Sequence, residues 1–231
     1  MRINMALFAI ADTHLSFGTN KPMDTFEGWK NYTEKLEKNW NKLVSDKDTV
    51  VIAGDISWAM NFDELKADFQ FIDNLNGNKI IIKGNHDYWW NTMSKMNAFI
   101  EENNFNSIKI LHNNSVTYNN ISICGSRGWL FESEEDHDEK ILNREVFRLK
   151  ASLDSAECEE KIVFLHYPPL TTNTTCEEII ALLNEYGISK CCYGHLHGDA
   201  AKYAIDGNRE NIDFKLISCD RLNFTPYLIL K

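Results

Sequence analysis

Short apolar runs alternate with longer amphipathic stretches along most of the chain. The runs are rich in β-branched residues, as buried strands are, and they span residues 3–11, 49–53, 79–82, 161–165 and 190–193. The stretches between them carry apolar residues at mixed spacings of three and four, which predicts helices over residues 26–43, 62–75, 89–101, 139–153 and 177–186. Asn61, Asn91 and Thr175 are the expected caps near the starts of three of these helices.

Two regions depart from this alternation. Residues 107–124 consist of short segments separated by turn formers, which predicts a meander of antiparallel strands. Residues 201–230 predict a second all-β region, with D-G-N-R-E-N as a hairpin turn. We therefore expect an α/β fold of two packed mixed β-sheets flanked by helices rather than one doubly wound sheet. The acidic run 132–139 is interpreted as a solvated loop that leads into a helix.

The length and the net charge of the chain limit the number of domains and the class of partner. A chain of 231 residues suits one domain, so we expect a single domain over 1–231, with 126–158 as a candidate helical cap. The 24 Lys and Arg residues against 34 Asp and Glu give a net charge of −10, which argues against a duplex nucleic-acid binder. It does not exclude an anionic substrate at a local positive centre.

The sequence shows none of the segments that direct a protein to a membrane or for secretion. The apolar start ends at Asp12, too early for a signal peptide, and no apolar run reaches the roughly 18 residues of a membrane span. The six cysteines are scattered without a C-x-x-C pair, which is typical of reduced thiols. We therefore expect a cytoplasmic protein without a membrane partner.

Five of the apolar runs end in a turn that carries potential metal ligands. The turns are A-D-T-H (Asp12, His14), A-G-D (Asp55), K-G-N-H-D (Asn85, His86, Asp87), L-H-Y-P-P (His166) and Y-G-H-L-H (His195, His197). Each motif alone is more often structural, a turn former or a hydrogen-bonded core histidine. Five of the seven histidines nevertheless fall in these turns, and the carboxyl ends of strands are where α/β sheets bind ligands. Together the turns predict one site.

Spacing and donor type indicate what the site binds. Alternate residues of an extended D-T-H or H-L-H segment point the same way, and Gly54, Gly84 and Gly194 let the backbone turn sharply beside the ligand positions. Imidazole, carboxylate and amide donors without cysteine suit Mn, Fe, Zn or Co. Seven donors exceed the needs of one tetrahedral ion, whereas two ions that share a bridging carboxylate would use them all.

At this point the sequence resembles the calcineurin-like metallophosphoesterase superfamily, whose pattern D-x-H, G-D, G-N-H-[DE], H, G-H-x-H runs in this order. The resemblance implies a four-layer sandwich of two sheets with helices outside, and a dinuclear site for two divalent or mixed-valence transition metal ions. It assigns one metal to Asp12, His14, Asp55 and His197, and the other to Asn85, His166, His195 and the same bridging Asp55. His86 would face the leaving group without binding metal.

The resemblance implies a hydrolase of small phosphomonoesters or phosphodiesters. Two metal ions roughly 3.5 to 4 Å apart would activate a bridging hydroxide for attack on phosphorus. His86 would protonate the leaving alkoxide or hydrogen-bond a phosphoryl oxygen. Neither the preferred ester, the metals nor the oligomeric state follows from the sequence.

The sequence departs from the superfamily's protein phosphatases in one segment. These continue G-D-x-x-D-R-G, whereas this chain has G-D-I-S-W-A-M, with Trp58 and Ala59 at the places of the second Asp and the Arg. An orienting partner for His86 must then come from elsewhere. Arg127 in G-S-R-G-W is a candidate phosphate grip or, equally, a solvated surface residue. The aromatic residues near the motifs are either an apolar wall for a flat leaving group or, more often, packing anchors: Trp58, Tyr88, Trp89, Trp90 and Trp129.

Two other functions remain as alternatives. A nuclease of the same superfamily is disfavoured, because the chain has no basic stripe. A non-catalytic scaffold with this fold, as a retromer subunit resembling the superfamily is, would be free to lose ligands. This chain keeps the whole set including His86, which favours the enzyme.

Overall fold

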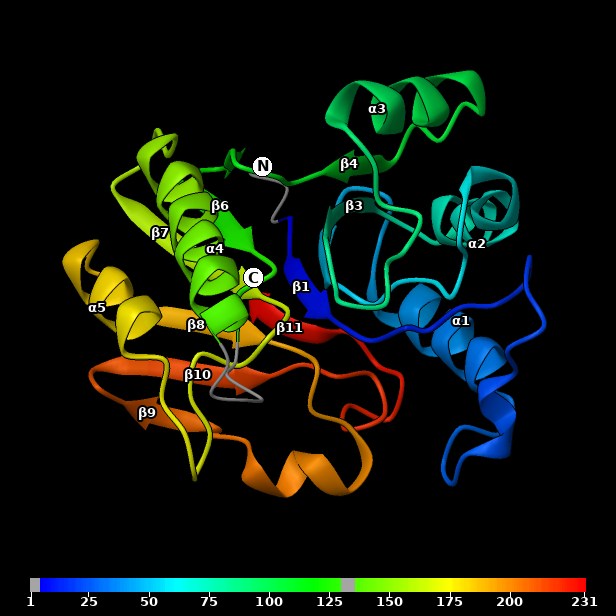
Figure 1. The fold of residues 1–231 in the computed structure, drawn as a ribbon. Helices are drawn as coiled ribbons and strands as arrows, with labels where there is room; N and C mark the ends of the chain where they lie inside the picture. Colours follow the sequence, from blue (N-terminus) through cyan, green and yellow to red (C-terminus); the bar gives the residue numbers. More distant parts are fainter. Residues whose placement is uncertain (1–4, 130–135) are drawn as a thin grey trace.

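Two mixed β-sheets pack face to face in the computed structural model, which describes residues 5–129 and 136–231 (Figure 1). The first sheet has the order β11-β1-β2-β3-β4. Its strands β1 to β4 are parallel, and β11 is antiparallel to β1. The bounds are Leu7–Ile10 for β1, Thr49–Ala53 for β2, Asn78–Ile82 for β3, Ile108–Ile110 for β4 and Tyr227–Leu230 for β11.

The second sheet has the order β5-β6-β7-β8-β10-β9. Strands β6, β7, β8 and β10 are parallel, and an antiparallel partner closes each edge. The bounds are Val116–Tyr118 for β5, Ile121–Ser126 for β6, Glu160–Leu165 for β7, Lys190–Tyr193 for β8, Gly207–Arg209 for β9 and Ile212–Leu216 for β10.

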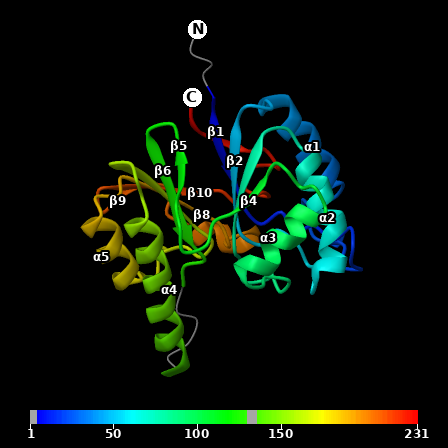
Figure 2. The same cartoon turned by 90° about the horizontal axis from the view of Figure 1, so that it is seen from above.

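Helices cover the outer face of each sheet, which gives four layers (Figure 2). Helices α1 (Tyr32–Leu43), α2 (Phe62–Asn74) and α3 (Met93–Glu102) lie on the first sheet. Helices α4 (Asp136–Asp154) and α5 (Glu177–Glu185) lie on the second, and none of the described helices is long and apolar enough to span a membrane. Two 3-10 helices, η1 (Met23–Thr25) and η2 (Gly198–Tyr203), complete the elements described.

The strands are apolar on both faces because both faces are buried. In β1, Leu7 and Ala9 face the layer between the sheets, whereas Phe8 and Ile10 pack in the cluster beneath α1, α2 and α3. The alternation follows from the two-residue period of a strand. The predicted fold, two packed mixed sheets flanked by helices, is confirmed.

The predicted meander at 107–124 is wrong. Strand β4 joins the first sheet parallel to β3, and only β5 and β6 form a hairpin, which opens the second sheet. The chain therefore crosses between the sheets in the H-N-N-S turn after β4. Turn formers mark where strands end, but not which sheet the next strand joins.

The hairpin predicted in 201–230 is present but shifted. Strand β9 lies within the predicted turn, and the two-residue connection to β10 is Glu210 and Asn211, both with positive φ (52° and 64°). This conformation suits a tight hairpin. Residues 201–203 belong to η2, and β11 pairs with β1 in the other sheet.

Helix starts agree with the sequence in one case of three. The side chain of Asn61 accepts a hydrogen bond from the Glu64 backbone N–H (3.0 Å), as predicted. Thr92, not Asn91, caps α3, and Cys176 stands at the cap position of α5 without a capping bond. Helix α1 begins only at residue 32, because left-handed conformations at residues 28 and 31 interrupt the expected helix.

The acidic run and the candidate cap lie around α4. Of the predicted acidic loop 132–139, positions 132–135 lie outside the described residues, and from Asp136 the chain is helical rather than a loop. Leu149 and Leu153 pack α4 against the outer face of the second sheet. A cap function for segment 126–158 stays a prediction.

A buried carboxylate on α2 ties this helix to the segments that follow β1 and β2. Asp68 accepts a hydrogen bond from the Phe17 backbone N–H (2.7 Å) and a short one from the Ser57 hydroxyl. Burial raises the pKa of Asp68 to about 6. The two segments that Asp68 fixes are the continuations of the A-D-T-H and A-G-D turns.

Replacing Asp68 by asparagine should change how stability depends on pH. The raised pKa means that Asp68 contributes stability that is full below pH 3.8 and lost as the pH rises through about 6. We therefore expect the free energy of unfolding of the wild type, minus that of Asp68→Asn, to fall by about 2 kcal/mol from pH 4 to pH 7. Urea unfolding across this range measures the difference, and a difference independent of pH would contradict the assignment.

Candidate metal centre

The turns that follow β1 and β2 run side by side, which brings their donors together. The Asp12 N–H donates to the Gly54 carbonyl (3.0 Å) and the His14 N–H to the Asp55 carbonyl (2.9 Å). Asp12, His14 and Asp55 all have left-handed backbones, with φ of 59°, 43° and 51°. Non-glycine residues adopt this conformation at a cost, and such strain gathers at functional sites.

Close backbone packing holds these turns against one another, as the glycines predicted. A Cβ on Gly54 would lie 2.6 Å from His166 Nδ1, and one on Gly84 would lie 2.1 Å from Asp55 Oδ1. A Cβ on Gly194 would lie 2.8 Å from Asp12 Oδ2. Each of these contacts is too short for any side chain, so the carboxylates and the imidazole reach their places only because glycine stands opposite.

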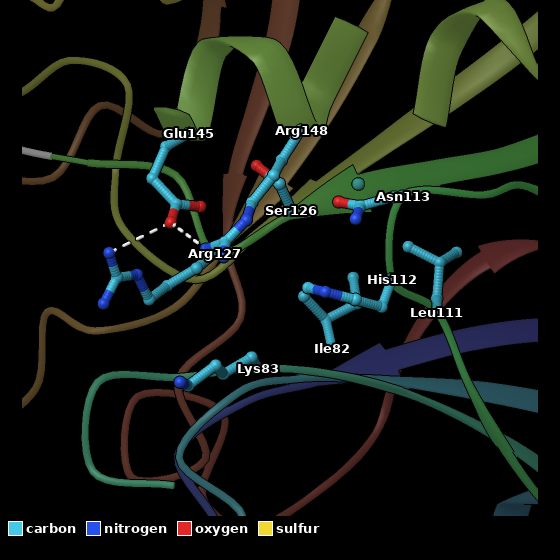
Figure 3. A pocket seen from close by; sticks show the side chains of 10 residues that line it. Ile82, Lys83, Leu111, His112, Asn113, Ser126, Arg127, Glu145 and Arg148 are labelled. Atoms are coloured by element: carbon cyan, nitrogen blue, oxygen red, sulfur yellow. Dashed lines mark hydrogen bonds and ion pairs between the residues drawn. The ribbon is translucent and has the colours of Figure 1, made fainter. Parts of the chain in front are cut away.

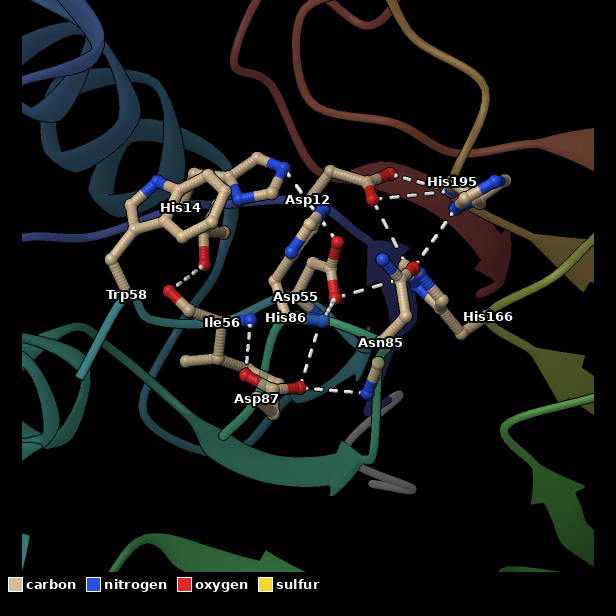
Figure 4. A network of polar contacts seen from close by, with 12 residues as sticks. Asp12, His14, Asp55, Ile56, Trp58, Asn85, His86, Asp87, His166 and His195 are labelled. Atoms are coloured by element: carbon tan, nitrogen blue, oxygen red, sulfur yellow. Dashed lines mark hydrogen bonds and ion pairs between the residues drawn. The ribbon is translucent and has the colours of Figure 1, made fainter. Parts of the chain in front are cut away.

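Two carboxylates and one imidazole form the centre of the site (Figure 4). One donor atom from each of Asp12, Asp55 and His166 lies within 4.8 Å of the others, and all three residues are buried. His166 Nδ1 lies 3.8 Å from Asp12 Oδ1, and its Nε2 lies 3.5 Å from Asp55 Oδ1. Donor atoms from three separate strand ends therefore converge on one point.

Asn85 and His195 extend this centre on the side of the second sheet. The Asn85 amide oxygen lies 2.6 Å from His166 Nε2 and 3.0 Å from His195 Nδ1. The His195 backbone N–H in turn lies 3.1 and 3.0 Å from the two carboxylate oxygens of Asp12. Asn85, His166 and His195 thus form one group, as in the set that the resemblance assigns to one metal.

His14 and His197 lie on the other side. The rings of His14 and His197 have centroids 5.4 Å apart, and His14 Nε2 lies 3.8 Å from Asp55 Oδ2. His14 is buried, yet neither of its ring nitrogens has a hydrogen-bond partner among the described residues. A buried imidazole without a partner is costly, and a metal ion would satisfy it. Asp55 lies between the two groups.

Burial shifts the pKa of five of these donors. It raises the pKa of Asp12 well above its usual range, with Asp55 as a second cause, and raises the pKa of Asp55 too. It lowers the pKa of His14 well below its usual range and those of His166 and His195 to about 3. Neutral imidazoles are the donor state that metal binding requires, whereas carboxyl groups whose pKa is raised by burial would release their protons to a bound cation. The residues present therefore fit bound divalent metal ions.

Asp87, which the sequence presented only as a potential metal ligand, holds two turns together by hydrogen bonds. Its buried carboxylate accepts hydrogen bonds from one side-chain and four backbone N–H groups: Trp89 Nε1 (3.1 Å), Gly84 (2.7 Å), Asp55 (3.0 Å), Ile56 (2.9 Å) and Ser57 (3.3 Å). It thereby clamps the turns after β2 and β3 together. The signal in the sequence was an acidic residue directly after G-N-H, ahead of an aromatic run.

His86 lies beside the centre with a partner that the sequence did not reveal. Its backbone N–H donates to Asp55 Oδ1 (2.8 Å), and its Nδ1 lies 3.1 Å from the Tyr88 hydroxyl. The ring of Trp58 packs against it with centroids 4.6 Å apart. Trp58 thus stands where the protein phosphatases have an aspartate, and Tyr88 supplies the polar contact instead.

A cleft of about 410 Å³ opens beside His14, His86 and His197. Its other lining residues are Met23, Phe26, Glu27, Trp29, Trp58, Gly198 and Asp199. Of the aromatic residues singled out in the sequence, Trp58 lines this cleft, whereas Trp89 is buried in the core against Phe69. Trp29, which the motifs did not point to, is a second tryptophan of the cleft.

Arg127 lines a different and much smaller cavity, between the ends of β3 and β6 (Figure 3). Its Nη2 lies 3.1 Å from Oε1 of the buried Glu145, and Arg148 pairs with the same oxygen. The Arg127 carbonyl accepts hydrogen bonds from the His166 and Tyr167 N–H groups. The phosphate grip stays a prediction, and the observed partner of Arg127 is Glu145.

Two known proteins are similar to this chain in sequence. A protein from Methanocaldococcus jannaschii without a known function is 30% identical over 117 residues, which are 48% of this chain and 61% of that protein. A protein of Vesicomyosocius okutanii named a probable cyclic nucleotide phosphodiesterase is 21% identical over 94% of this chain and 86% of its own.

One solved structure shares the fold across the whole chain. Phosphopantetheinyl hydrolase from Mycobacterium tuberculosis aligns with a TM-score of 0.58 at 15% identity, covering 100% of this chain and 97% of its own. The model of the calcineurin-like phosphoesterase family matches residues 5–199. This match covers every predicted site residue from Asp12 to His197. The chain therefore belongs to the calcineurin-like phosphoesterase family, and the prediction of a phosphoric ester hydrolase is confirmed.

Proposed function

We propose that this protein hydrolyses small phosphodiesters with the help of two divalent transition metal ions. The observation that carries the proposal is the convergence of two buried carboxylates, Asp12 and Asp55, with neutral imidazoles around them. Without cations these carboxylates would stay uncompensated in a buried place. The relatives named probable cyclic nucleotide phosphodiesterases favour a diester over a monoester.

The two groups of donors would each hold one ion. Asp12, His14, Asp55 and His197 are the proposed ligands of one, and Asn85, His166, His195 and Asp55 those of the other. Asp55 would serve both ions, because its carboxylate lies near both His14 and His166. Nitrogen and oxygen donors of this kind suit Mn, Fe, Zn or Co.

The bound ions would supply an activated water and offset the charge of the phosphoryl group. The chain's own residues fix the geometry around them. Asp87 holds the backbone of the turn that carries Asp55, and Asp55 receives the His86 N–H. His86 is thus anchored at its backbone within the cleft where the ester would lie.

We assign the proton transfer to the leaving group to His86. The hydroxyl of Tyr88 at Nδ1 leaves Nε2 for the leaving oxygen, and Trp58 limits the tilt of the ring. Tyr88 is therefore a positioning residue, in the place of the acidic partner that the motif lacks.

The six cysteines are all free, which supports a location in the reducing cytoplasm.

Hydrolysis of bis-p-nitrophenyl phosphate beside p-nitrophenyl phosphate tests the function. Metal-stripped protein resupplied with Mn, Fe, Co or Zn should cleave the diester with the higher kcat/KM. Asp55→Asn should lose both bound metal and turnover, whereas Asp154→Asn, at an exposed carboxylate on α4, should keep both. Absence of metal-dependent turnover of either ester would contradict the proposal, and a preference for the monoester would refute its diester part.

The role of His86 is tested by variants that leave the metal ligands intact. His86→Ala should lower kcat by about 10²- to 10⁴-fold, with metal content unchanged, because general acid catalysis is lost. Tyr88→Phe should lower kcat by about 5-fold, the effect of one lost hydrogen bond. Both losses should be larger for an alkyl ester than for a nitrophenyl ester, since nitrophenolate leaves without a proton. Equal losses for the two esters would remove both residues from proton transfer.

A further inference from the structure

The cleft beside His86 has two walls that come from distant parts of the chain. One wall is the segment 23–29, which begins with η1 and passes through Gly28 with a φ of 83°. The other is the segment 197–199 at the start of η2, where the Gly198 N–H is held by the Asp220 carboxylate (2.7 Å). Three residues of the proposed active site, His14, His86 and His197, line the cleft between them. A group that leaves from the site would enter this cleft.

The two walls of the cleft carry acidic side chains. Among the described residues that line it, none is a lysine or an arginine, whereas Glu27 and Asp199 contribute two carboxylates from opposite walls. Both residues are exposed to solvent. The cleft would therefore repel an alcohol part that carries further phosphates and attract one that carries a positive charge.

Aromatic rings supply the rest of the lining. Trp29 is 3% exposed and fixed by its neighbours, whereas Phe26 is 59% exposed. Trp58 stacks on His14 with centroids 4.9 Å apart. The ammonium group of Lys21, which is not among the lining residues, lies 4.9 Å from the Trp58 ring centroid. The Trp58 ring is thus already packed against His14 and Lys21, and Phe26 is the most exposed aromatic ring of the cleft.

We propose that the cleft binds the alcohol part of the substrate, and that this part carries a compact ammonium group of the choline type. Aromatic faces with nearby carboxylates are what recognises quaternary ammonium ligands. The proposal rests on the proposed function, since it names the ester that the same site cleaves. In the reaction, water adds to phosphorus, the P–O bond to the amino alcohol breaks, and the alcohol leaves with one proton.

The proposal divides the two charges of the substrate between two places. The metal ions would receive the phosphate, and Glu27 and Asp199 would face the ammonium group. Phe26 would cover its methyl groups, which explains an apolar side chain left exposed at the mouth of a polar site. A polyanion such as a nucleic acid would meet two carboxylates instead of a basic surface.

A pair of substrates with the same shape isolates the charge. The methyl phosphodiester of choline and that of 3,3-dimethylbutanol differ only in the ammonium nitrogen, which is carbon in the second. With manganese-loaded protein we expect kcat/KM for the choline ester to be about 10-fold higher. Glu27→Gln and Asp199→Asn should each reduce this ratio, whereas Glu37→Gln, which removes an exposed charge on α1, should keep it. An equal or inverted ratio in the wild type would overturn the proposal.

Binding without turnover separates this proposal from the proposed function. Choline titrated into metal-free protein should bind more tightly than 3,3-dimethylbutanol in calorimetry. Phe26→Ala should weaken that binding, and Phe147→Ala, at another exposed phenylalanine, should not. Equal affinities for the two alcohols would overturn the cleft proposal even where bis-p-nitrophenyl phosphate is hydrolysed. Failure to hydrolyse that diester, with choline still bound, would instead overturn the phosphodiesterase.

Discussion

The structure depends on the burial of two carboxylates, Asp12 and Asp55, side by side at the carboxyl edge of the sheets. Moving one ionised carboxylate out of water costs several kcal/mol, and a second one nearby adds repulsion. The protein brings no lysine or arginine to either in the described residues. It surrounds them with imidazoles that burial keeps neutral. Burial raises the pKa of both carboxyl groups, so a bound cation would stabilise their ionised form.

The backbone conformation around the two carboxylates also brings the donor atoms together. Asp12, His14 and Asp55 adopt left-handed conformations, and glycines opposite them admit contacts that any side chain would block. The Asp87 carboxylate accepts hydrogen bonds from five N–H groups, and four of these belong to the backbone of two turns. Strain at the donors is thereby offset by hydrogen bonds behind them.

The site could be predicted from the sequence because each donor follows a buried strand, and parallel strands end at one edge. The alternation of apolar runs and amphipathic stretches indicated an α/β fold, whereas the two packed sheets were inferred from the regions that depart from it and the four layers from the family resemblance. The partner of His86 could not be predicted, because a hydroxyl two residues away looks like any other tyrosine. The path of the chain from β4 to β5 was equally hidden, since it depends on which sheet offers a free edge. The late start of α1 at Tyr32 follows from left-handed conformations at Gly28 and Asn31, two residue types that adopt this conformation readily, and the apolar spacing alone did not show it.

The most direct measurement is a crystal structure of the manganese-loaded protein with anomalous scattering from the metal. Two anomalous peaks should appear about 3.5 to 4 Å apart, with the Asp55 carboxylate touching both. His14 should contact one ion through a ring nitrogen, neither of which has a hydrogen-bond partner among the described residues. A single peak, or two peaks that do not share Asp55, would contradict the account of a dinuclear centre.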